Sequence, residues 1–270
     1  MSTTLLLVGG GKMGGALLDG WLDQGVNSSD IFVIEPDDEA RERLRTKGVR
    51  AGTELAEMPS DFSASVTVFA VKPQAMDEVV PAYAVLKNRT NFFLSIAAGK
   101  PTAYFEAALG DDAAIVRTMP NTPAAVGRGI TVLFANPRVD DDAKAIAEQL
   151  LSAVGATAWV NDEGLMDAVT AVSGSGPAYI FYLIECLASA GVRAGLPPDL
   201  SQHLARATVC GAGELAYRDS TPVDVLRRNV TSPGGTTEAA LAVLMKGDAL
   251  AELMGRAVVA ATERSRELAT

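Results

Sequence analysis

The sequence of 270 residues is 48% hydrophobic and 21% charged, which predicts a packed core in one large domain or two small ones. Its formal net charge of −10 at pH 7 argues against a nucleic-acid partner, which would require clustered Lys and Arg side chains. Two cysteines and one histidine are too few for a disulfide scaffold or a Cys/His zinc cluster, so no metal site is expected.

The N-terminal segment does not resemble a signal peptide, because its apolar run at 5–8 is short and leads directly into glycines. The longest apolar stretch, 178–192, is shorter than the roughly 18 residues of a membrane span and contains Glu185. We therefore expect a cytoplasmic protein with no membrane partner.

A glycine-rich turn follows the first apolar run. Gly9, Gly11 and Gly14 fit the G-x-G-x-x-G pattern, and Lys12 and Met13 lie between the last two glycines. In this pattern the first glycine permits a tight turn, the second lets the backbone approach a pyrophosphate, and the third lets the helix pack against the strand. The N–H groups at the start of that helix would bind the phosphates. The turn therefore predicts a dinucleotide site.

An acidic residue ends the next apolar run. Glu35 lies about 20 residues beyond the glycine turn, where a carboxylate binds the ribose 2′-OH of a dinucleotide. The same carboxylate would repel a 2′-phosphate, so Glu35 favours NADH while NADPH remains usable.

The first part of the chain alternates strand-like and helix-like segments. Apolar runs rich in β-branched residues and Phe occur at 4–8, 31–35, 66–71, 91–96, 113–117, 130–134 and 156–160. Amphipathic stretches such as 37–47, 73–86 and 140–154 separate most of them. This alternation predicts parallel β-α-β units, and thus an α/β domain with a doubly wound sheet of Rossmann type.

Three loops follow predicted strands in this domain: AVKPQ at 70–74, SIAAG at 95–99 and MPNTP at 119–123. Because ligands bind at the carboxyl ends of strands in open α/β sheets, we expect these loops to border one crevice. The small residues of SIAAG would let a flat nicotinamide ring approach the backbone. The residues assigned to the coenzyme here are Val71, Lys72, Pro73, Ala97, Ala98 and Asn121.

After residue 162 the strand-like runs stop and Ala- and Leu-rich segments follow, at 163–173, 176–194, 198–217, 222–229, 235–245 and 248–268. The sequence therefore predicts a Rossmann domain at 1–162 and an all-helical domain at 163–270. The helix at 176–194 is apolar nearly all round, so it must be covered by protein. We expect a second subunit to supply part of that cover.

The helical half contains a second glycine loop, TSPGG, which leads into the helix-favouring segment TTEAAL. A glycine loop at a helix start can present free N–H groups to an anion. The loop thus predicts a second anion site.

These motifs, in this order, resemble those of the pyrroline-5-carboxylate reductase family. The resemblance covers essentially the whole chain and is carried by VGGGKMG, AVKPQ, SIAAG, RTMPNTPA, AVSGSGPAY, GLPP and NVTSPGGTTEAAL. It implies reduction of Δ1-pyrroline-5-carboxylate, a cyclic imino acid, to L-proline with NADH or NADPH, the last step of proline biosynthesis. It also implies a helical dimerisation domain, a homodimer at least, and in many members a decamer.

The resemblance further implies which residues hold the substrate. Its carboxylate would be bound by Ser232, Gly234, Gly235, Thr236 and Thr237, with Asn229 and Val230 leading into the loop. Thr237 would also face the ring nitrogen.

The source of the imine proton is left open by the motifs, which contain no His and no suitably placed Asp or Glu. The substrate could bind as the iminium, or Thr237 could donate a hydrogen bond and relay a proton from water. The pKa of a threonine hydroxyl is too high for a strong acid, which favours orientation over donation. Lys72 is the alternative proton donor.

Two other functions are compatible with parts of the pattern. A β-hydroxyacid dehydrogenase also joins a Rossmann domain to a helical one, but it needs a lysine in the helical part, and here only Lys246 follows residue 162, in a turn. A catalytically silent NAD-binding dimer would not need the intact SPGGTT loop.

Overall fold

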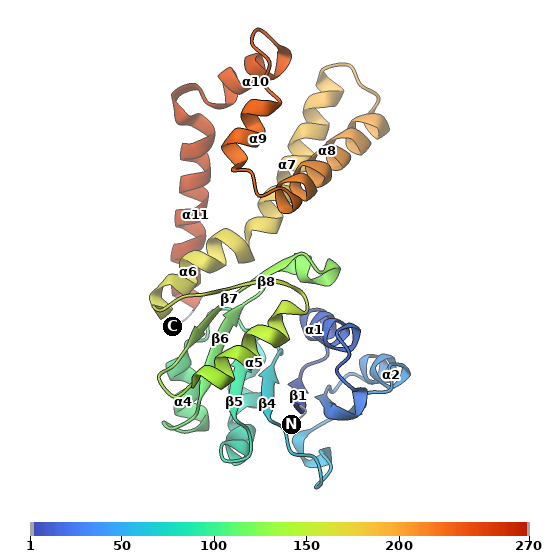
Figure 1. Cartoon of the computed structure of the whole chain (residues 1–270), viewed down its shortest axis with the longest axis vertical. Helices are drawn as coiled ribbons and strands as arrows, with labels where there is room; N and C mark the ends of the chain where they lie inside the picture. Colours follow the sequence, from blue (N-terminus) through green and yellow to red (C-terminus); the bar gives the residue numbers. More distant parts are fainter. Residues whose placement is uncertain (1–2, 269–270) are drawn as a thin grey trace. The chain divides into compact units, whose positions relative to one another are not determined.

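The computed structural model describes residues 3–268, which divide into two units (Figure 1). One contains the residues up to Gly174 together with those from Ala261 onward, and the other spans Ser175–Ala260. The contacts therefore keep residues 163–174 with the α/β unit, whereas the sequence places the boundary at 162–163. Buried Met166 and Ala171 explain the difference, because they fix this helical segment within the first unit.

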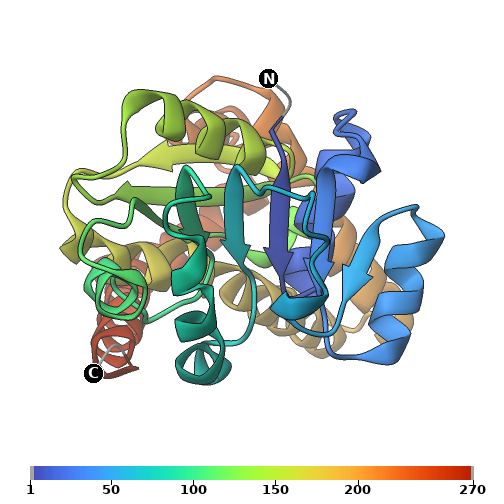
Figure 2. The ribbon, with the colours of Figure 1, turned by 90° about the horizontal axis from the view of Figure 1, so that it is seen from below.

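The first unit is built on one eight-stranded sheet in the order β3-β2-β1-β4-β5-β6-β7-β8, seen from below in Figure 2. The strands are β1 (Leu5–Val8), β2 (Ile31–Ile34), β3 (Arg50–Gly52), β4 (Val66–Phe69), β5 (Phe92–Ser95), β6 (Ile115–Met119), β7 (Gly129–Ala135) and β8 (Gly155–Trp159). All seven expected strands are confirmed, as is the Rossmann-type fold. The sequence missed β3, because three residues without an apolar run carry no strand signal.

All neighbouring strands are parallel except β6 and β7, which are antiparallel. The expectation of purely parallel units is wrong at this pair. A parallel connection needs a crossover of about a dozen residues or more. Residues 120–128, which form a 3₁₀ helix at Thr122–Val126, are too short for one.

Helices cover both faces of the sheet. On one side pack α1 (Lys12–Asp23), α2 (Asp38–Thr46) and α5 (Asp141–Ser152), and on the other α3 (Met76–Val79) and α4 (Thr102–Leu109). The strands are consequently buried on both faces: Leu5 and Leu7 contribute to one core, and Leu6 and Val8 to the other.

The amphipathic stretch 73–86 is not one helix. It consists of 3₁₀ turns at Pro73–Ala75 and Val80–Leu86 around the four-residue α3. Pro81 explains the interruption, because proline lacks the N–H that a continuous helix requires and its ring clashes with the preceding turn.

Helices alone make up the second unit, apart from its turns. These are α7 (Gly176–Arg193), α8 (Pro198–Arg218), α9 (Val223–Asn229), α10 (Thr236–Leu244) and the start of α11 (Ala249–Leu268), while α6 (Met166–Val169) belongs to the first unit. The turn between α7 and α8 uses Gly195 at φ +102°, a conformation that favours glycine. Ser201 of α8 donates a hydrogen bond to the Ala188 carbonyl of α7 at 2.6 Å, which ties the pair together.

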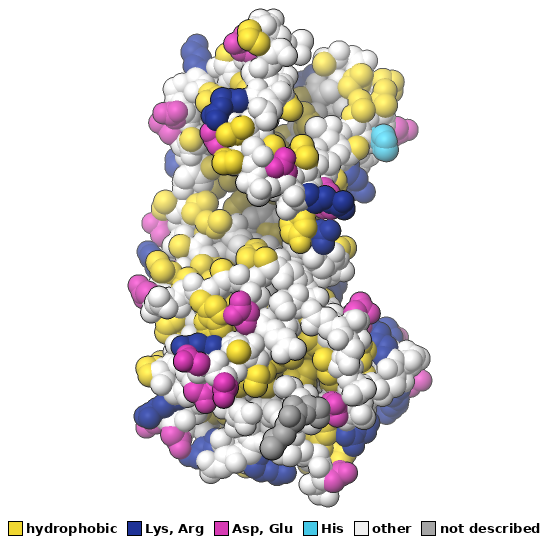
Figure 3. All heavy atoms as spheres, viewed as in Figure 1, with side chains coloured by type: hydrophobic (Ala, Val, Ile, Leu, Met, Phe, Trp, Pro, Cys, Tyr) yellow, Lys and Arg dark blue, Asp and Glu magenta, His cyan; other side chains and the backbone are white. Residues whose placement is uncertain are grey.

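Helix α7 has no buried residue in the single chain. Phe181 is 59% exposed and Tyr182 67%, and apolar side chains are visible on the surface of this unit in Figure 3. Cys186 and Cys210 in this unit are also exposed. An apolar helix left open in this way requires cover from another chain. None of the helices within residues 3–268 combines the length and the apolarity needed to cross a membrane.

Replacing Phe181 by Glu should dissociate the oligomer, because the new charge would be buried without a partner. Light scattering should change from at least twice the chain mass of 28.1 kDa to that mass. The control is Val85→Glu, an exposed apolar position in the first unit. A Phe181→Glu protein that keeps the wild-type mass would contradict the assignment of this face.

Candidate active site

The carboxyl ends of the central strands lie at one level. Val8 of β1 pairs with Ile34 of β2 and with Phe69 of β4, and Phe69 pairs with Ser95 of β5. Each of these residues is the last of its strand, so the four following loops begin side by side. Strand β6 is parallel to β5 and brings Met119 and the MPNTP loop to the same edge.

The first glycine loop has the geometry that its pattern predicts. Gly9 has φ +102°, and a Cβ on Gly14 would lie only 2.1 Å from the Gly9 carbonyl oxygen. A Cβ on Gly11 would meet no atom within 4 Å, so this position faces open space. Lys12 and Met13 form the first turn of α1, whose unpaired N–H groups lie next to that space.

Glu35 lies directly after β2 and is 8% exposed. Its Oε2 accepts the Gly10 N–H at 2.7 Å, and its Oε1 accepts the Asp37 N–H at 3.0 Å. The sequence suggested only a ribose contact for this carboxylate. The structure shows that it also fastens the glycine loop to the end of β2.

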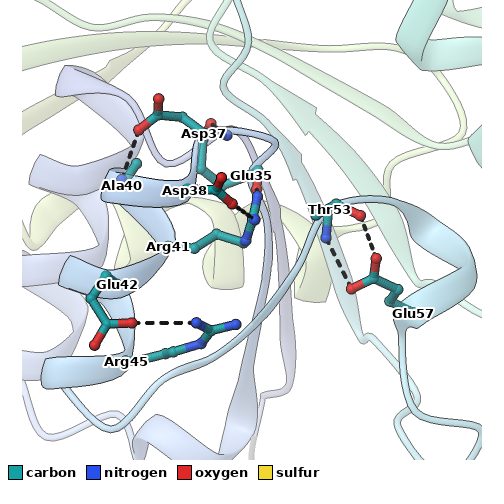
Figure 4. Close-up of polar contacts among 9 residues, drawn as sticks. All are labelled: Glu35, Asp37, Asp38, Ala40, Arg41, Glu42, Arg45, Thr53 and Glu57. Atoms are coloured by element: carbon teal, nitrogen blue, oxygen red, sulfur yellow. Dashed lines mark hydrogen bonds and ion pairs between the residues drawn. The ribbon is translucent and has the colours of Figure 1, made fainter.

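A cation that the sequence motifs did not indicate contacts the backbone of Glu35. Arg41 of α2 donates to the Glu35 carbonyl oxygen at 2.8 Å and pairs with Asp38 (Figure 4). Nearby, Thr53 donates to Glu57, and these hydrogen bonds lower the pKa of the Glu57 carboxyl below its ordinary value. The only sequence signal for Arg41 is its i,i+3 spacing from Asp38 on α2, which is weak.

A cavity of about 1060 Å³ borders the glycine loop and Glu35. Its wall includes the cations Lys12, Arg43 and Lys47 together with the acids Asp19, Asp23, Glu35 and Asp37, and Lys47 is paired with Asp19. The wall therefore has no excess of positive charge, and a phosphate there would depend on the backbone N–H groups at the start of α1. The described residues contain no cluster of three or more His, Cys, Asp or Glu side chains arranged to hold a metal.

The next two loops frame the same edge. Val71 lies against the glycine turn, since a Cβ on Gly9 would come within 3.0 Å of its side chain. Lys72 is exposed and precedes the 3₁₀ turn that begins at Pro73. Ala97 is buried and Ala98 half-buried, so the loop after β5 presents a surface of small side chains.

Asn121 uses both ends of its side chain within the protein. Its Oδ1 accepts the Ile130 N–H at 3.0 Å, and its Nδ2 donates to the Ser173 carbonyl at 3.1 Å. At the same junction a Cβ on Gly174 would lie 2.3 Å from Met119. Asn121, assigned to the coenzyme from the sequence, therefore joins the MPNTP and SGSGP segments in the structure.

The second glycine loop leads into α10 in the helical unit. Gly234 has φ +69°, Gly235 is the N-cap, and Thr236 and Thr237 are the first two helical residues. The Gly234 N–H is accepted by Glu238 at 2.7 Å, a cap that the sequence did not reveal. Ser232 is exposed at the loop entry, after Asn229, the last residue of α9, and Val230. The structure thus groups the coenzyme candidates in the first unit and the substrate candidates in the second.

Residues 163–268 match the family model described as pyrroline-5-carboxylate reductase dimerisation. A pyrroline-5-carboxylate reductase from Pseudomonas aeruginosa is 41% identical over 271 residues, covering 100% of this chain and 98% of the relative. The chain belongs to the pyrroline-5-carboxylate reductase family. The family predicted from the motifs is therefore confirmed.

Other similarities agree with this assignment. Residues 4–99 match the model described as NADP oxidoreductase, coenzyme F420-dependent. A pyrroline-5-carboxylate reductase from Synechocystis is 42% identical, with 99% of both chains covered. The structure of one from Coxiella burnetii is 37% identical, covers 100% of both chains and has a TM-score of 0.94. A Plasmodium falciparum pyrroline carboxylate reductase solved with NADP bound is 29% identical, covers 99% of this chain and 98% of its own, and has a TM-score of 0.82.

The family assignment identifies the chain as an NAD(P)H-dependent oxidoreductase, and the dimerisation domain indicates a homo-oligomer. Full-length similarity to reductases favours this family over the β-hydroxyacid dehydrogenases.

Gly14→Ala and Gly11→Ala form a matched pair that tests the glycine loop. Gly14→Ala should lower the free energy of unfolding by about 2–3 kcal/mol in urea titrations, since its methyl group would overlap the Gly9 carbonyl. Gly11→Ala should leave that free energy within about 1 kcal/mol. It should nevertheless weaken NADH binding about tenfold, because the methyl group occupies the space beside the helix start. Equal effects on stability would contradict the two roles.

Proposed function

We propose that the chain reduces Δ1-pyrroline-5-carboxylate to L-proline, the last step of proline biosynthesis. A hydride from NADH or NADPH adds to the imine carbon, which becomes C5 of proline, the nitrogen gains or already holds a proton, and NAD⁺ or NADP⁺ is released. The observation that carries the proposal is the full-length similarity to pyrroline-5-carboxylate reductases, over both the coenzyme loops and the second glycine loop.

The coenzyme is proposed to lie along the strand ends of the first unit. Its pyrophosphate would accept hydrogen bonds from the N–H groups at the start of α1, beside the open space at Gly11. Glu35 would meet the adenosine ribose, and Ala97 and Ala98 would lie beside the nicotinamide. Bound in this way, the coenzyme supplies the hydride, while the protein fixes the position of its ring.

The substrate carboxylate is proposed to bind at the start of α10. The N–H groups of Thr236 and Thr237 have no partner within the helix, while Glu238 already accepts that of Gly234. The Ser232 hydroxyl would add a polar contact. No positive side chain is needed, which suits a chain of net charge −10.

Thr237 is proposed to orient the imine nitrogen through its hydroxyl, with Lys72 as the alternative source of a proton. The homo-oligomer is proposed to be a dimer whose α7 helices cover one another, with a decamer as the larger assembly. A cytoplasmic location is proposed.

The direct test follows NADH absorbance after Δ1-pyrroline-5-carboxylate is added to the purified protein. Substrate-dependent oxidation with L-proline as product is expected. Unchanged absorbance with both NADH and NADPH, from a protein that binds either coenzyme, would support a silent NAD-binding dimer instead.

Glu35→Ser should raise the NADPH:NADH ratio of kcat/KM about tenfold, because it removes the charge that repels a 2′-phosphate. Both coenzymes should also bind more weakly, since Gly10 and Asp37 lose their acceptor. Glu39→Ser is the control, an exposed acid four residues further on, in helix α2. An unchanged ratio would refute the ribose contact.

Thr237→Ala should lower kcat/KM at least about tenfold, whereas Thr237→Ser, which keeps the hydroxyl, should remain close to wild type. Lys72→Met separates the alternative, since it should be the more damaging change if lysine supplies the proton. A Thr237→Ala enzyme within a factor of about two, roughly 0.4 kcal/mol, would remove Thr237 from the mechanism.

A further inference from the structure

The last part of helix α11 packs with the first unit, which contains the proposed coenzyme site. Residues from Ala261 onward group with the α/β unit, although α11 begins in the other one. Ser265 is 5% exposed and donates to Asp167 of α6 at 2.6 Å. The last turns of α11 are therefore a fixed part of the first unit.

This end of the helix contacts the loop after β5. Gly99 is buried with φ +76°, and a Cβ placed on it would lie 3.3 Å from the Leu268 carbonyl oxygen and 3.7 Å from the Leu268 side chain. Gly99 directly follows Ala97 and Ala98, so Leu268 supports the back of the loop proposed to face the nicotinamide.

The far end of the loop is fastened by Glu163, from the segment that also contains Asp167. Glu163 accepts the Thr102 N–H and hydroxyl, each at 2.8 Å, and pairs with buried Arg117 at 2.9 Å. The segment 163–169 therefore contacts the loop in two ways. Glu163 binds Thr102 directly, and Asp167 binds Ser265 of the helix whose end, Leu268, lies against Gly99.

The middle of the loop has a third support. Lys100 pairs with Asp77 at 2.7 Å and lies over the Tyr104 ring at 4.2 Å. Its hydrogen bond lowers the pKa of the Asp77 carboxyl below the ordinary value. Ala97 is held in the core, and its N–H is accepted by the Ser95 hydroxyl at 3.2 Å. Half-buried Ala98 has no side chain long enough to anchor itself, so its position depends on these neighbours.

We propose that Asp167, Ser265 and Leu268 form a C-terminal clamp that positions the 97–99 loop against the nicotinamide ring. The inference rests on the proposed function. Hydride transfer requires the reacting carbons to be held within about 3–3.5 Å, so a small shift of this wall slows the reaction or weakens binding of the nicotinamide half. The clamp residues are positioning residues that act through the loop.

Ser265→Ala tests the clamp when the affinities of NADH and ADP-ribose are compared, because ADP-ribose lacks the nicotinamide. The Kd of NADH should rise about fivefold, the change expected for one lost hydrogen bond, while that of ADP-ribose stays within about twofold. Ser265→Thr should restore NADH binding. Arg264→Ala is the control, since it removes only the exposed pair with Glu267 on the same turn.

A chain ending at Glu267 provides a second variant, because it removes the Leu268 contact and keeps Ser265. It should show the same selective loss of NADH affinity. Equal weakening of both ligands, or no weakening, in the folded variant would overturn the clamp. If the wild-type protein turns over substrate and Ser265→Ala binds NADH as tightly as wild type, the clamp alone is refuted. If the wild-type protein binds coenzyme but does not turn over substrate, the proposed function alone is refuted.

Discussion

Backbone N–H groups at the start of a helix have no partner within that helix, and both glycine loops of this chain present such groups. The rest of the structure serves to place them. In the first unit, Gly14 allows α1 to pack against β1, and the aligned strand ends set the neighbouring loops around it. In the second unit, Gly234 and the Glu238 cap fix where α10 begins. In the proposed function, an acidic chain binds a phosphorylated coenzyme and a carboxylate substrate through these backbone groups.

Much of this arrangement could be predicted from the periodicity of apolar residues and from the positions of Gly and Pro. The apolar runs identified seven strands, and Gly and Pro residues marked the helices of the second half. Gly9 and Gly14 have the backbone roles expected of them, a positive φ and a close approach of helix to strand, because only glycine permits either. The role of Gly11 beside a pyrophosphate stays a prediction. Strand β3 was missed because three residues carry too little pattern, and Pro81 broke the stretch that periodicity treats as one helix.

Side-chain partners could not be predicted in the same way. The sequence assigned Glu35 and Asn121 to the coenzyme. It could not show that the Glu35 carboxylate accepts the N–H groups of Gly10 and Asp37. Nor could it show that the Asn121 side chain hydrogen-bonds to Ile130 and Ser173. Such contacts depend on the approach of segments far apart in the chain. The same holds for the return of Leu268 to Gly99. The apolar character of α7, in contrast, could be predicted from the sequence. Its exposure in the single chain is the physical basis for a homo-oligomer.

In the proposed function the chain moves a hydride from the nicotinamide to the imine carbon of a substrate held by its carboxylate. The most direct measurement uses NADH carrying deuterium at the transferred position, with mass spectrometry and NMR of the product. The expected product is L-proline with one deuterium, located at C5. Proline without deuterium, or deuterium at another carbon, would contradict the proposed function.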